Sequence, residues 1–546
     1  GNPPWETLEL KEREFFQVRA PEIANADTQS KRRKLISKLE DENPDLYTEY
    51  KQRDENIEAQ SNFISESGRF SRSGQGKINI YAPFAEHAWE NISEEGRTGI
   101  VVPTGIATDY HTRDFFADLV DEKSIVSLFD FVNKEKIFQG IPADQRFCLL
   151  TLSNRETPQD RFSFSFLNRD IDMLNDRDRR YELTREQILT INPNTKNCPI
   201  FESKKDRDIT LQLYQGAPVL INENQETNPW DINYNILYNS ASDSELFDDN
   251  TLEELKSEGY NLDGNIFRGD DQVFLPVWGA KFIHQFNHRF GTFEGVPKEK
   301  RFARRAGTNR VTIDQKKDMT YEILPRYWLK REIFSKKLSD MNWQRGWFFA
   351  FREIVRATSD VRVAKATICP QHPFVDTAPV LTFECDEPEQ RALLFTCFFT
   401  SIPFEFALRQ SLGGAHITKY ILKQLPMPKP SDLNGIKITT EGETKPLRDL
   451  FVDYGLQLTW TSHSLDEFGQ KIEPNEGPFE WDEEERREMR TAIDAIVAKL
   501  FDISREDFEY VLDSYTTLKK NETEEHGYYR KKEECLEKFD SVEVIR

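Results

Sequence analysis

The apolar segments GIVVP (residues 99–103), SIVSLFDFV (124–132) and RFCLLTL (146–152) decide the fold expected for the first part of this chain. Each segment is short, rich in β-branched and aromatic residues, and bounded by polar or turn-forming residues. This pattern predicts strands that are buried on both faces. Apolar residues at helical spacing occupy 78–91 and 109–120, before and after the first strand. Short buried strands that alternate with helices predict an α/β layered sheet.

Working outward from these strands, the chain divides into three regions. Residues 1–166 contain the strands and are expected to form part of an α/β domain. Residues 167–430 carry many aromatic residues at irregular spacing and end in the proline cluster QLPMPKP (424–430), which marks a boundary. This second region is expected to be mixed α+β. Residues 431–546 combine charged stretches with helical patterns, and we expect an acidic helical region there.

The composition is that of a soluble globular protein. Of the 546 residues, 37% are hydrophobic and 31% are charged, and the net charge is −22. No apolar run approaches the roughly 18 residues that a membrane helix needs, and the N-terminus has no secretory signal. A cytoplasmic protein with no membrane partner is therefore expected.

The negative charge is unevenly distributed. Residues 431–546 hold 16 Lys+Arg against 29 Asp+Glu, whereas residues 296–337 hold 13 against 5. A local basic stretch can meet DNA phosphates even on an acidic protein. The alternative is a solvated face, or pairing with the chain's own carboxylates. The candidate DNA-binding residues of this stretch are Lys298, Lys300, Arg301, Arg304, Arg305 and Arg310.

Other side chains are candidates for separate roles. Arg352, Arg356 and Arg362 could each form paired hydrogen bonds with a guanine, with structural ion pairs as the alternative. His284 and His288 are four residues apart, a spacing that would place them on one face of a helix. No glutamate completes a metal-binding pattern between them, so no metal site is predicted, and a structural or phosphate-contacting role with Lys281 and Arg289 is expected instead.

The N-terminal tetrapeptide Asn2-Pro3-Pro4-Trp5 fits the pattern Asn/Asp-Pro-Pro-aromatic. An adenine amino group is a weak nucleophile because its lone pair is delocalised into the ring. The side-chain carbonyl of Asn2 and the backbone carbonyl of Pro3 can each accept one of its N–H bonds and so direct the lone pair toward a methyl donor. The two prolines hold the loop rigid, and Trp5 offers a flat face on which an extruded base can stack. A plain Pro-Pro turn with a surface tryptophan is the alternative.

The order of several further blocks resembles one family along nearly the whole chain. This is the family of large adenine-specific DNA methyltransferases found in type IIG restriction–modification and phage-defence systems. Its catalytic tetrapeptide is similar to residues 2–5. Other similar blocks, in chain order, are NIYAPF (79–84), GRTGIVVP (96–103), LPVWGAKFIHQFNHRF (275–290), WFFAFREIVRAT (347–358) and LGGAHITKYILKQLPMP (412–428).

The resemblance implies a fold, a reaction and partners. It implies part of a class I methyltransferase domain, followed by a target-recognition region and a helical C-terminal piece. It also implies methyl transfer from S-adenosylmethionine to adenine in a specific site of duplex DNA, with Asn2, Pro3, Pro4 and Trp5 as the catalytic residues. The family's Gly-rich cofactor loop does not occur in this sequence. The chain begins inside the tetrapeptide, and we expect that loop to lie in an upstream half.

Two alternatives stay open at this point. The chain could be a non-catalytic DNA-recognition or assembly module of a defence complex, with other defence proteins as partners. It could also belong to a bifunctional restriction–modification enzyme with an upstream nuclease. If the methyltransferase interpretation holds, the basic stretch at 296–337 is expected to line a cleft beside the first region, facing Trp5.

Overall fold

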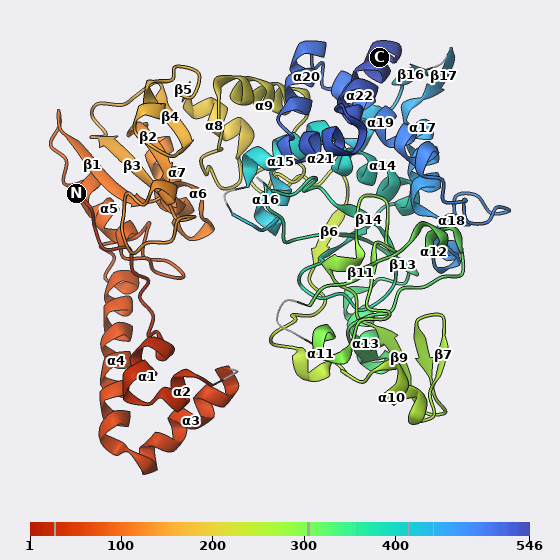
Figure 1. Cartoon of the computed structure of the whole chain (residues 1–546). Coiled ribbons are helices and arrows are strands. Elements are labelled where there is room, and N and C mark those ends of the chain that lie inside the picture. Colours follow the sequence, from red (N-terminus) through yellow and green to blue (C-terminus); the bar gives the residue numbers. More distant parts are fainter. Residues whose placement is uncertain (27–28, 303–305, 358, 413, 441) are drawn as a thin grey trace. The chain divides into compact units, whose positions relative to one another are not determined.

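The computed structural model of the chain describes residues 1–26, 29–302, 306–357, 359–412, 414–440 and 442–546 (Figure 1). The chain forms two compact units, residues 1–207 and residues 208–546. We call them unit 1 and unit 2 and describe each by itself. The architecture is mixed α/β with several separate sheets. This bears out the α/β class predicted from the sequence.

Unit 1 is built on a five-stranded sheet in the order β1-β3-β2-β4-β5. The sequence predicts three of these strands, whereas β4 and β5 were not expected. Serines alternate with phenylalanines in β4, so it lacks the continuous apolar run that marks the other strands. The strands are β1 (Arg97–Pro103), β2 (Ile125–Val132), β3 (Arg146–Ser153), β4 (Phe162–Asn168) and β5 (Tyr181–Leu183).

Strand direction gives this sheet a distinct carboxyl edge. β3 lies between β1 and β2 and is antiparallel to both, so β1 and β2 run the same way. β4 is parallel to β2 on its other side. Both predicted helices are present, as α5 (Tyr81–Glu90) and α7 (Arg113–Asp121), and α5 packs against β1. The carboxyl ends of β1 and β2 therefore meet at one edge, where ligands of such sheets usually bind.

Residues 12–66 of unit 1 form a helical arm with its own small core. Figure 1 shows this arm extending away from the sheet of unit 1. Its core contains Phe16, Ile23, Ile36, Leu39 and Leu46. Pro44 begins the longest helix, and Asn43 caps it by accepting a hydrogen bond from the Leu46 N–H at 3.3 Å. The helices are α1 (Glu12–Arg19), α2 (Pro21–Ala24), α3 (Gln29–Glu42) and α4 (Pro44–Glu66).

Unit 2 contains two four-stranded antiparallel sheets. The strands β13, β14 and β15 of the central sheet are buried along their whole length, and α14 (Pro388–Thr400) packs on them. The central sheet comprises β14 (Ala366–Pro370), β13 (Trp347–Phe351), β15 (Val380–Phe383) and β6 (Ile232–Asn235). The second comprises β12 (Trp328–Lys330), β9 (Val273–Pro276), β8 (Ile266–Arg268) and β7 (Asn261–Asp263).

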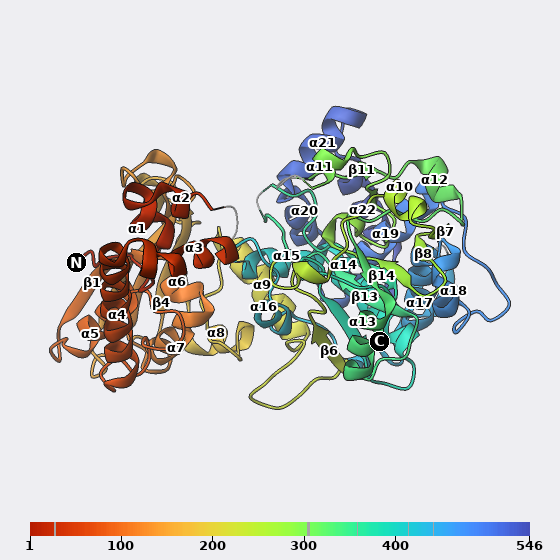
Figure 2. The ribbon, with the colours of Figure 1, turned by 90° about the horizontal axis from the view of Figure 1, so that it is seen from below.

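The C-terminal helices are packed into this same unit. Among their contacts is one between α19 (Glu483–Leu500) and α14, the helix that packs on the central sheet (Figure 2). Arg486 of α19 donates hydrogen bonds to the carbonyls of Phe286 and Leu458, at 2.9 and 2.7 Å. Among the described residues no single helix is long and apolar enough to cross a membrane. Only α14 and α15 (Ile402–Ser411), bent by 67° at their junction, reach that length together, and both are largely buried here.

A buried carboxylate joins α15 to the chain before β14. Glu405 is fully buried and accepts a hydrogen bond from Arg362 Nε at 2.7 Å, from the Val363 N–H at 2.9 Å and from Arg409 Nη2 at 2.9 Å. Burial alone would raise the pKa of Glu405, but the charges of Arg362 and Arg409 bring that pKa below its ordinary value. The carboxylate is thus held ionised between two arginines.

We predict that Glu405→Leu destabilises the protein by about 3–5 kcal/mol at pH 7, because two buried guanidinium groups lose their counter-charge. The folded-state pKa of Glu405 is depressed, so its contribution is complete above the unfolded pKa of about 4.3 and is lost as pH falls through the folded pKa. The difference from wild type in urea unfolding should therefore shrink in acid. The exposed-site control Glu488→Leu should change stability by under about 0.5 kcal/mol. Equal stability of Glu405→Leu and wild type at pH 7 would contradict this assignment.

Candidate functional site

The tetrapeptide at residues 2–5 lies along strand β1. The Gly1 amino group donates to the Gly99 carbonyl at 2.6 Å, and the Val101 N–H donates to the Gly1 carbonyl at 2.8 Å. The two bonds go to the residues on either side of Ile100, which is the hydrogen-bond pattern of parallel strands, so the N-terminal residues run parallel to β1. Residues 2–5 consequently run toward the carboxyl edge of the sheet, where β1 and β2 end.

Within the tetrapeptide, the tryptophan is anchored and the asparagine is accessible. The indole Nε1–H of Trp5 donates to the Val101 carbonyl at 3.2 Å, and its ring is half-buried. Asn2 is exposed, and in the part of the chain that the structure describes its side chain forms no hydrogen bond. Its carbonyl oxygen is therefore available to accept a hydrogen bond from a ligand.

An aromatic cluster that the sequence analysis missed surrounds Trp5. Phe147 of β3 stacks with Trp5 at a ring-centroid distance of 6.2 Å, and Phe138 meets its edge at 5.3 Å. Phe138 and Phe147 contact each other at 4.9 Å, and Phe131 of β2 stacks on Phe147 at 5.5 Å. Phe138 lies in the loop after β2. In the sequence, the feature that could have indicated it is a single phenylalanine in a polar loop at the carboxyl edge of the sheet.

Asn133 holds this loop, residues 133–145, in place. Its buried side chain donates to the carbonyls of Phe138 and Ile141 at 3.0 and 3.2 Å and accepts from the Phe138 N–H at 3.0 Å. The Asn133 N–H also donates to the Gln145 carbonyl at 3.0 Å. One amide thereby places Phe138 beside Trp5.

A buried charge pair fixes the strands beneath the cluster. The carboxylate of Asp130 in β2 accepts two hydrogen bonds from Arg146 of β3, at 3.1 and 3.0 Å. It also accepts from the Thr104 hydroxyl at 2.5 Å and from the Leu167 N–H at 2.8 Å. Four elements at the carboxyl edge are therefore joined through one side chain.

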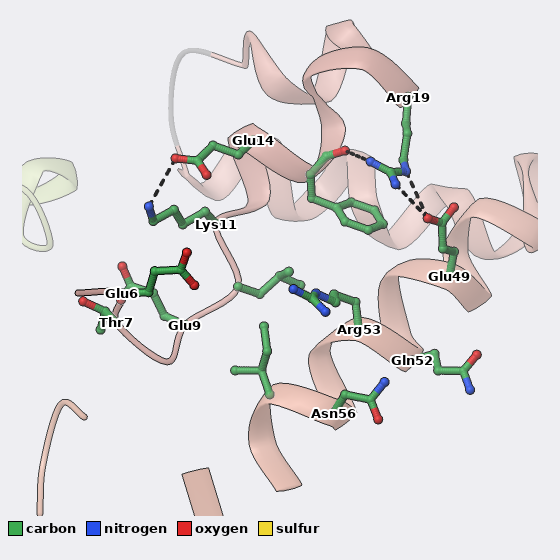
Figure 3. Close-up of a pocket in the computed structure, with 13 residues that line it drawn as sticks. Glu6, Thr7, Glu9, Lys11, Glu14, Arg19, Glu49, Gln52, Arg53 and Asn56 are labelled. Atoms are coloured by element: carbon green, nitrogen blue, oxygen red, sulfur yellow. Dashed lines mark hydrogen bonds and ion pairs between the residues drawn. The ribbon is translucent and has the colours of Figure 1, made fainter. Parts of the chain in front are cut away.

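A pocket of about 690 Å³ opens immediately after Trp5 (Figure 3). Residues 6–19 line one side and α4 lines the other, and an ion pair between Arg19 and Glu49, at 2.9 Å, lies among the lining residues. Its charged lining includes the carboxylates of Glu6, Glu9, Glu14 and Glu49 as well as three cations. This mixture of charges does not fit a DNA backbone, which needs a surplus of positive charge.

The structure separates the predicted basic residues of unit 2 from one another. Lys298 is paired with Glu254 at 2.6 Å. Arg301 is wrong as a phosphate contact, because it is buried, donates to the Phe293 carbonyl at 3.3 Å and has a pKa lowered by burial. Lys300 and Arg310 are exposed. Arg304 and Arg305 lie outside the described residues.

Arg310 and Arg352 share one aromatic ring. Their guanidinium carbons lie 3.7 and 5.1 Å from the centroid of Phe290. Neither forms an ion pair within the described residues. Burial and the neighbouring charge of Arg310 lower the pKa of Arg352 to about 10. The carboxylate of Asp360 offsets this lowering only in part. Two cations held this close, with no ion pair of their own among the described residues, favour a site for an anionic or hydrogen-bond-accepting ligand.

The remaining arginine candidates differ in exposure. Arg362 is wrong as a guanine contact, because it is buried and paired with Glu405 at 2.7 Å. Arg356 is exposed, two residues beyond the exposed Ile354. It stays a candidate.

The helical spacing expected for His284 and His288 is wrong. These residues lie in a turn closed by a bridge between His284 and Asn287, with Phe286 at a φ of +52°. His284 stacks on Phe290 at 4.3 Å, and His288 Nε2 lies 3.0 Å from the Ser462 hydroxyl. Burial first, and nearby cations second, lower the pKa of both. His288 is therefore a neutral core residue, and His284 is a neutral, partly buried one.

A phosphate-contacting role is wrong for Arg289, and for both neighbours the structure supports the structural role that was also expected, although Lys281 is exposed. Arg289 is fully buried and donates to the carbonyls of Lys316, Asp318 and Thr461, each at 2.8 Å. Lys281 donates to the carbonyl of Ala306. Both cations join segments of unit 2 to one another.

Comparison with known families bears on unit 1. Residues 43–138 match the model of the Eco57I restriction-modification methylase family. This part of unit 1 is therefore similar to a restriction-modification methylase. The matched segment runs from the start of α4 through α5, β1, α7 and β2 to Phe138, so it includes Phe131 and Phe138 of the aromatic cluster but not Trp5 or Phe147. A search of curated proteins returned no match.

Solved structures with low sequence identity are also similar. The type IIG restriction endonuclease BpuSI is 12% identical, with 84% of this chain and 52% of that chain covered and a TM-score of 0.26. The type IIL restriction-modification enzyme MmeI, in complex with DNA, is 9% identical, with 80% and 52% covered and a TM-score of 0.37. A DrdV–DNA complex is 8% identical, with 74% and 42% covered and a TM-score of 0.34. The chain spans about half the length of these proteins or less.

We predict that Asn133→Ala releases the loop beside Trp5. The loop loses the hydrogen bonds that the Asn133 side chain makes. If these contribute about 1.4 kcal/mol, the population of the locally open loop rises roughly tenfold. Lys134 and Lys136 are both exposed, and the rate of trypsin cleavage after them should rise roughly tenfold. Asn91→Ala, which removes an exposed amide from the end of α5, serves as the control. Unchanged cleavage in Asn133→Ala would show that other contacts hold the loop.

Proposed function

We propose that this chain is the part of an adenine-specific DNA methyltransferase, of the restriction–modification type, that carries the catalytic tetrapeptide. The observation that carries the proposal is the placement of residues 2–5. They lie at the carboxyl edge of the sheet, with an accessible Asn2 and an anchored Trp5 among phenylalanines. The methylase match over residues 43–138 supports the same reaction class. Such an enzyme would act on cytoplasmic DNA in host-versus-phage discrimination.

The tetrapeptide would act by orientation rather than as a base. An adenine turned out of the duplex would place its amino group against the Asn2 side-chain carbonyl and the Pro3 carbonyl. Accepting both N–H bonds favours a pyramidal nitrogen whose lone pair points at the methyl group. Pro4 adds rigidity to the loop. The ring of Trp5, fixed by Val101 and supported by Phe138 and Phe147, would receive the flat face of the base.

S-adenosylmethionine is the proposed methyl donor, and when bound it supplies the methyl group. The Gly-rich loop typical of its site does not occur among the residues of this chain. We therefore assign none of them to its main pocket. The roles proposed for the present residues concern the adenine alone.

We predict that Asn2→Ala in the active enzyme lowers the methylation rate by about 10²–10³, the usual cost of losing a preorganised electrostatic contact. DNA affinity should change little, because phosphate contacts supply most of it. Methyl transfer to duplex DNA is measured with labelled donor, and the methylated base is identified by mass spectrometry. Asn91→Ala, distant from the tetrapeptide, is the matched control. A rate within a few-fold of wild type would remove Asn2 from the mechanism, and methylcytosine as the product would exclude adenine specificity.

For DNA contact, the candidates that the structure favours are Arg310 and Arg352. Both lie against Phe290, and neither forms an ion pair within the described residues. Arg352 Nε already donates to the Ile283 carbonyl at 2.6 Å, so the terminal nitrogens of Arg352 and the guanidinium of Arg310 are the proposed donors. Among the other candidates, Lys300 and Arg356 are exposed and remain in the proposal. The proposed position of the 296–337 stretch in a cleft facing Trp5 stays a prediction.

We predict that Arg310→Gln weakens DNA binding and reduces the salt slope of log K by about 0.9 if a phosphate contact is lost. Arg352→Lys keeps the charge but removes the paired donors. It should therefore relax discrimination at one base pair by about 1–3 kcal/mol if Arg352 contacts a guanine. Lys298→Gln is the control, since Glu254 already neutralises that lysine. Salt-titrated binding to target and mismatched duplexes measures all three. Arginine variants that behave like the control would reject this surface as a DNA contact.

A further inference from the structure

The charge on α3 of the helical arm is sharply segregated. Residues 31–38 contain five cations and no carboxylate, whereas residues 40–42 are three consecutive acids, Glu-Asp-Glu. The whole arm, residues 12–66, has 13 Asp+Glu and 9 Lys+Arg, a net charge of −4. The basic half of α3 is therefore an isolated patch on an acidic arm.

This order of charges opposes the stability of the helix. The N-terminal end of a helix carries partial positive charge, so acids stabilise its first turn and bases its last. α19 follows that rule, with Glu483, Glu484 and Glu485 in its first turn. α3 has no acid in its first turn and no base in its last. Each misplaced charge costs a few tenths of a kcal/mol, so helix stability does not explain the pattern.

Most of the cations face solvent. Arg32 alone is turned inward, where it is paired with Glu12 at 3.5 Å, on the same helix face as the buried Ile36 and Leu39. Lys31, Arg33, Lys34 and Lys38 are exposed. Lys31, Lys34 and Lys38 are spaced i, i+3, i+7 and share the outer face. Over the stretches that the structure describes, the side chains of Arg33, Lys34 and Lys38 form no ion pair or hydrogen bond.

The arm is attached directly beside the catalytic tetrapeptide. Its two stems pair with each other through a bridge between Thr7 and Asn79, and Thr7 is two residues beyond Trp5. α4 has 23 residues, and a helix of that size is about 34 Å long at 1.5 Å per residue. α3 is joined to the start of α4, at the end away from the sheet of unit 1 (Figure 1). Its cations are consequently carried well away from the base-binding site but on the same unit.

We infer that the exposed basic face of α3 binds the phosphate backbone of duplex DNA outside the methylated site. This rests on the proposed function, which supplies the DNA. Lys31 to Lys38 extends over about 10 Å of helix. Each DNA strand presents a phosphate for about every 3.4 Å of its axis, so this stripe can face several. Such a polyanion would explain why Arg33, Lys34 and Lys38 are exposed without an ion pair among the described residues, and why the acids of α3 are confined to residues 40–42. α3 lies outside the residues that match the methylase family.

The test is a variant of the full chain in which three cations of α3 are replaced by uncharged glutamines, Arg33→Gln/Lys34→Gln/Lys38→Gln. Log K against log salt should become shallower by up to about 2.7, or 0.9 for each contact. Affinity for target and unrelated duplexes should fall by the same factor, at least about tenfold at 50 mM salt. The variant's melting temperature should stay close to that of wild type, because the three side chains are exposed and form no ion pair within the described residues.

A matched control removes the same charge from paired positions in and beside the arm. Lys11, Arg19 and Lys77 form ion pairs with Glu14, Glu49 and Glu9, at 3.4, 2.9 and 2.8 Å. Lys11→Gln/Arg19→Gln/Lys77→Gln should retain the wild-type salt slope. The inference is overturned if both triple variants have the same slope, whether that slope is changed or unchanged.

A second measurement separates this inference from the proposed function. In the active enzyme the α3 variant should methylate at the wild-type rate with saturating DNA and show a raised KM for DNA, whereas Asn2→Ala loses the rate itself. A photo-crosslinking residue at position 34 should label duplex DNA, and the same residue at the exposed position 58 of α4 should not. Crosslinking at neither position, with wild-type DNA binding intact, would reject the arm as a DNA contact while leaving the methyltransferase proposal untouched.

Discussion

The pairing of the first residues with β1 is the constraint on which the candidate site depends. Two backbone bonds fix Gly1 beside Ile100, and the indole of Trp5 is held by the next carbonyl, that of Val101. These bonds direct the two prolines toward the edge where β1 and β2 end. Phe138 and Phe147 can then surround Trp5, and Asn133 and Asp130 in turn hold the loop and strands that carry them.

The sequence predicted the sheet well where local pattern and burial agree. The apolar runs at 99–103, 124–132 and 146–152 are strands in the structure. Burial on both faces was wrong for the first of them, because in β1 only Ile100 and Val102 are buried and their neighbours are partly or fully exposed. β4 was missed because its serines interrupt the apolar run. The tetrapeptide was recognisable from its chemistry, but its partner Phe147 comes from β3 and Phe138 from the loop after β2, and contacts between such distant segments cannot be read from spacing.

The errors in unit 2 share one physical cause. Arg289, Arg301 and Arg362 were grouped with surface cations because sequence shows charge and not burial. Each is buried against carbonyls or a carboxylate. A guanidinium has five donors, so it can satisfy several backbone groups where segments without regular structure meet. His284 and His288 have helical spacing, but Phe286 between them has a positive φ, which a helix does not allow.

The arm also affects how the chain reaches its folded state. Trp5 and its partner Val101 are 96 positions apart, and closing a flexible loop of that length is entropically costly and slow. The four helices of the arm make mostly local contacts, which form early in folding. Once they have formed and Thr7 has met Asn79, most of the intervening chain is already ordered. The remaining search needed to bring residues 2–5 to β1 is then short.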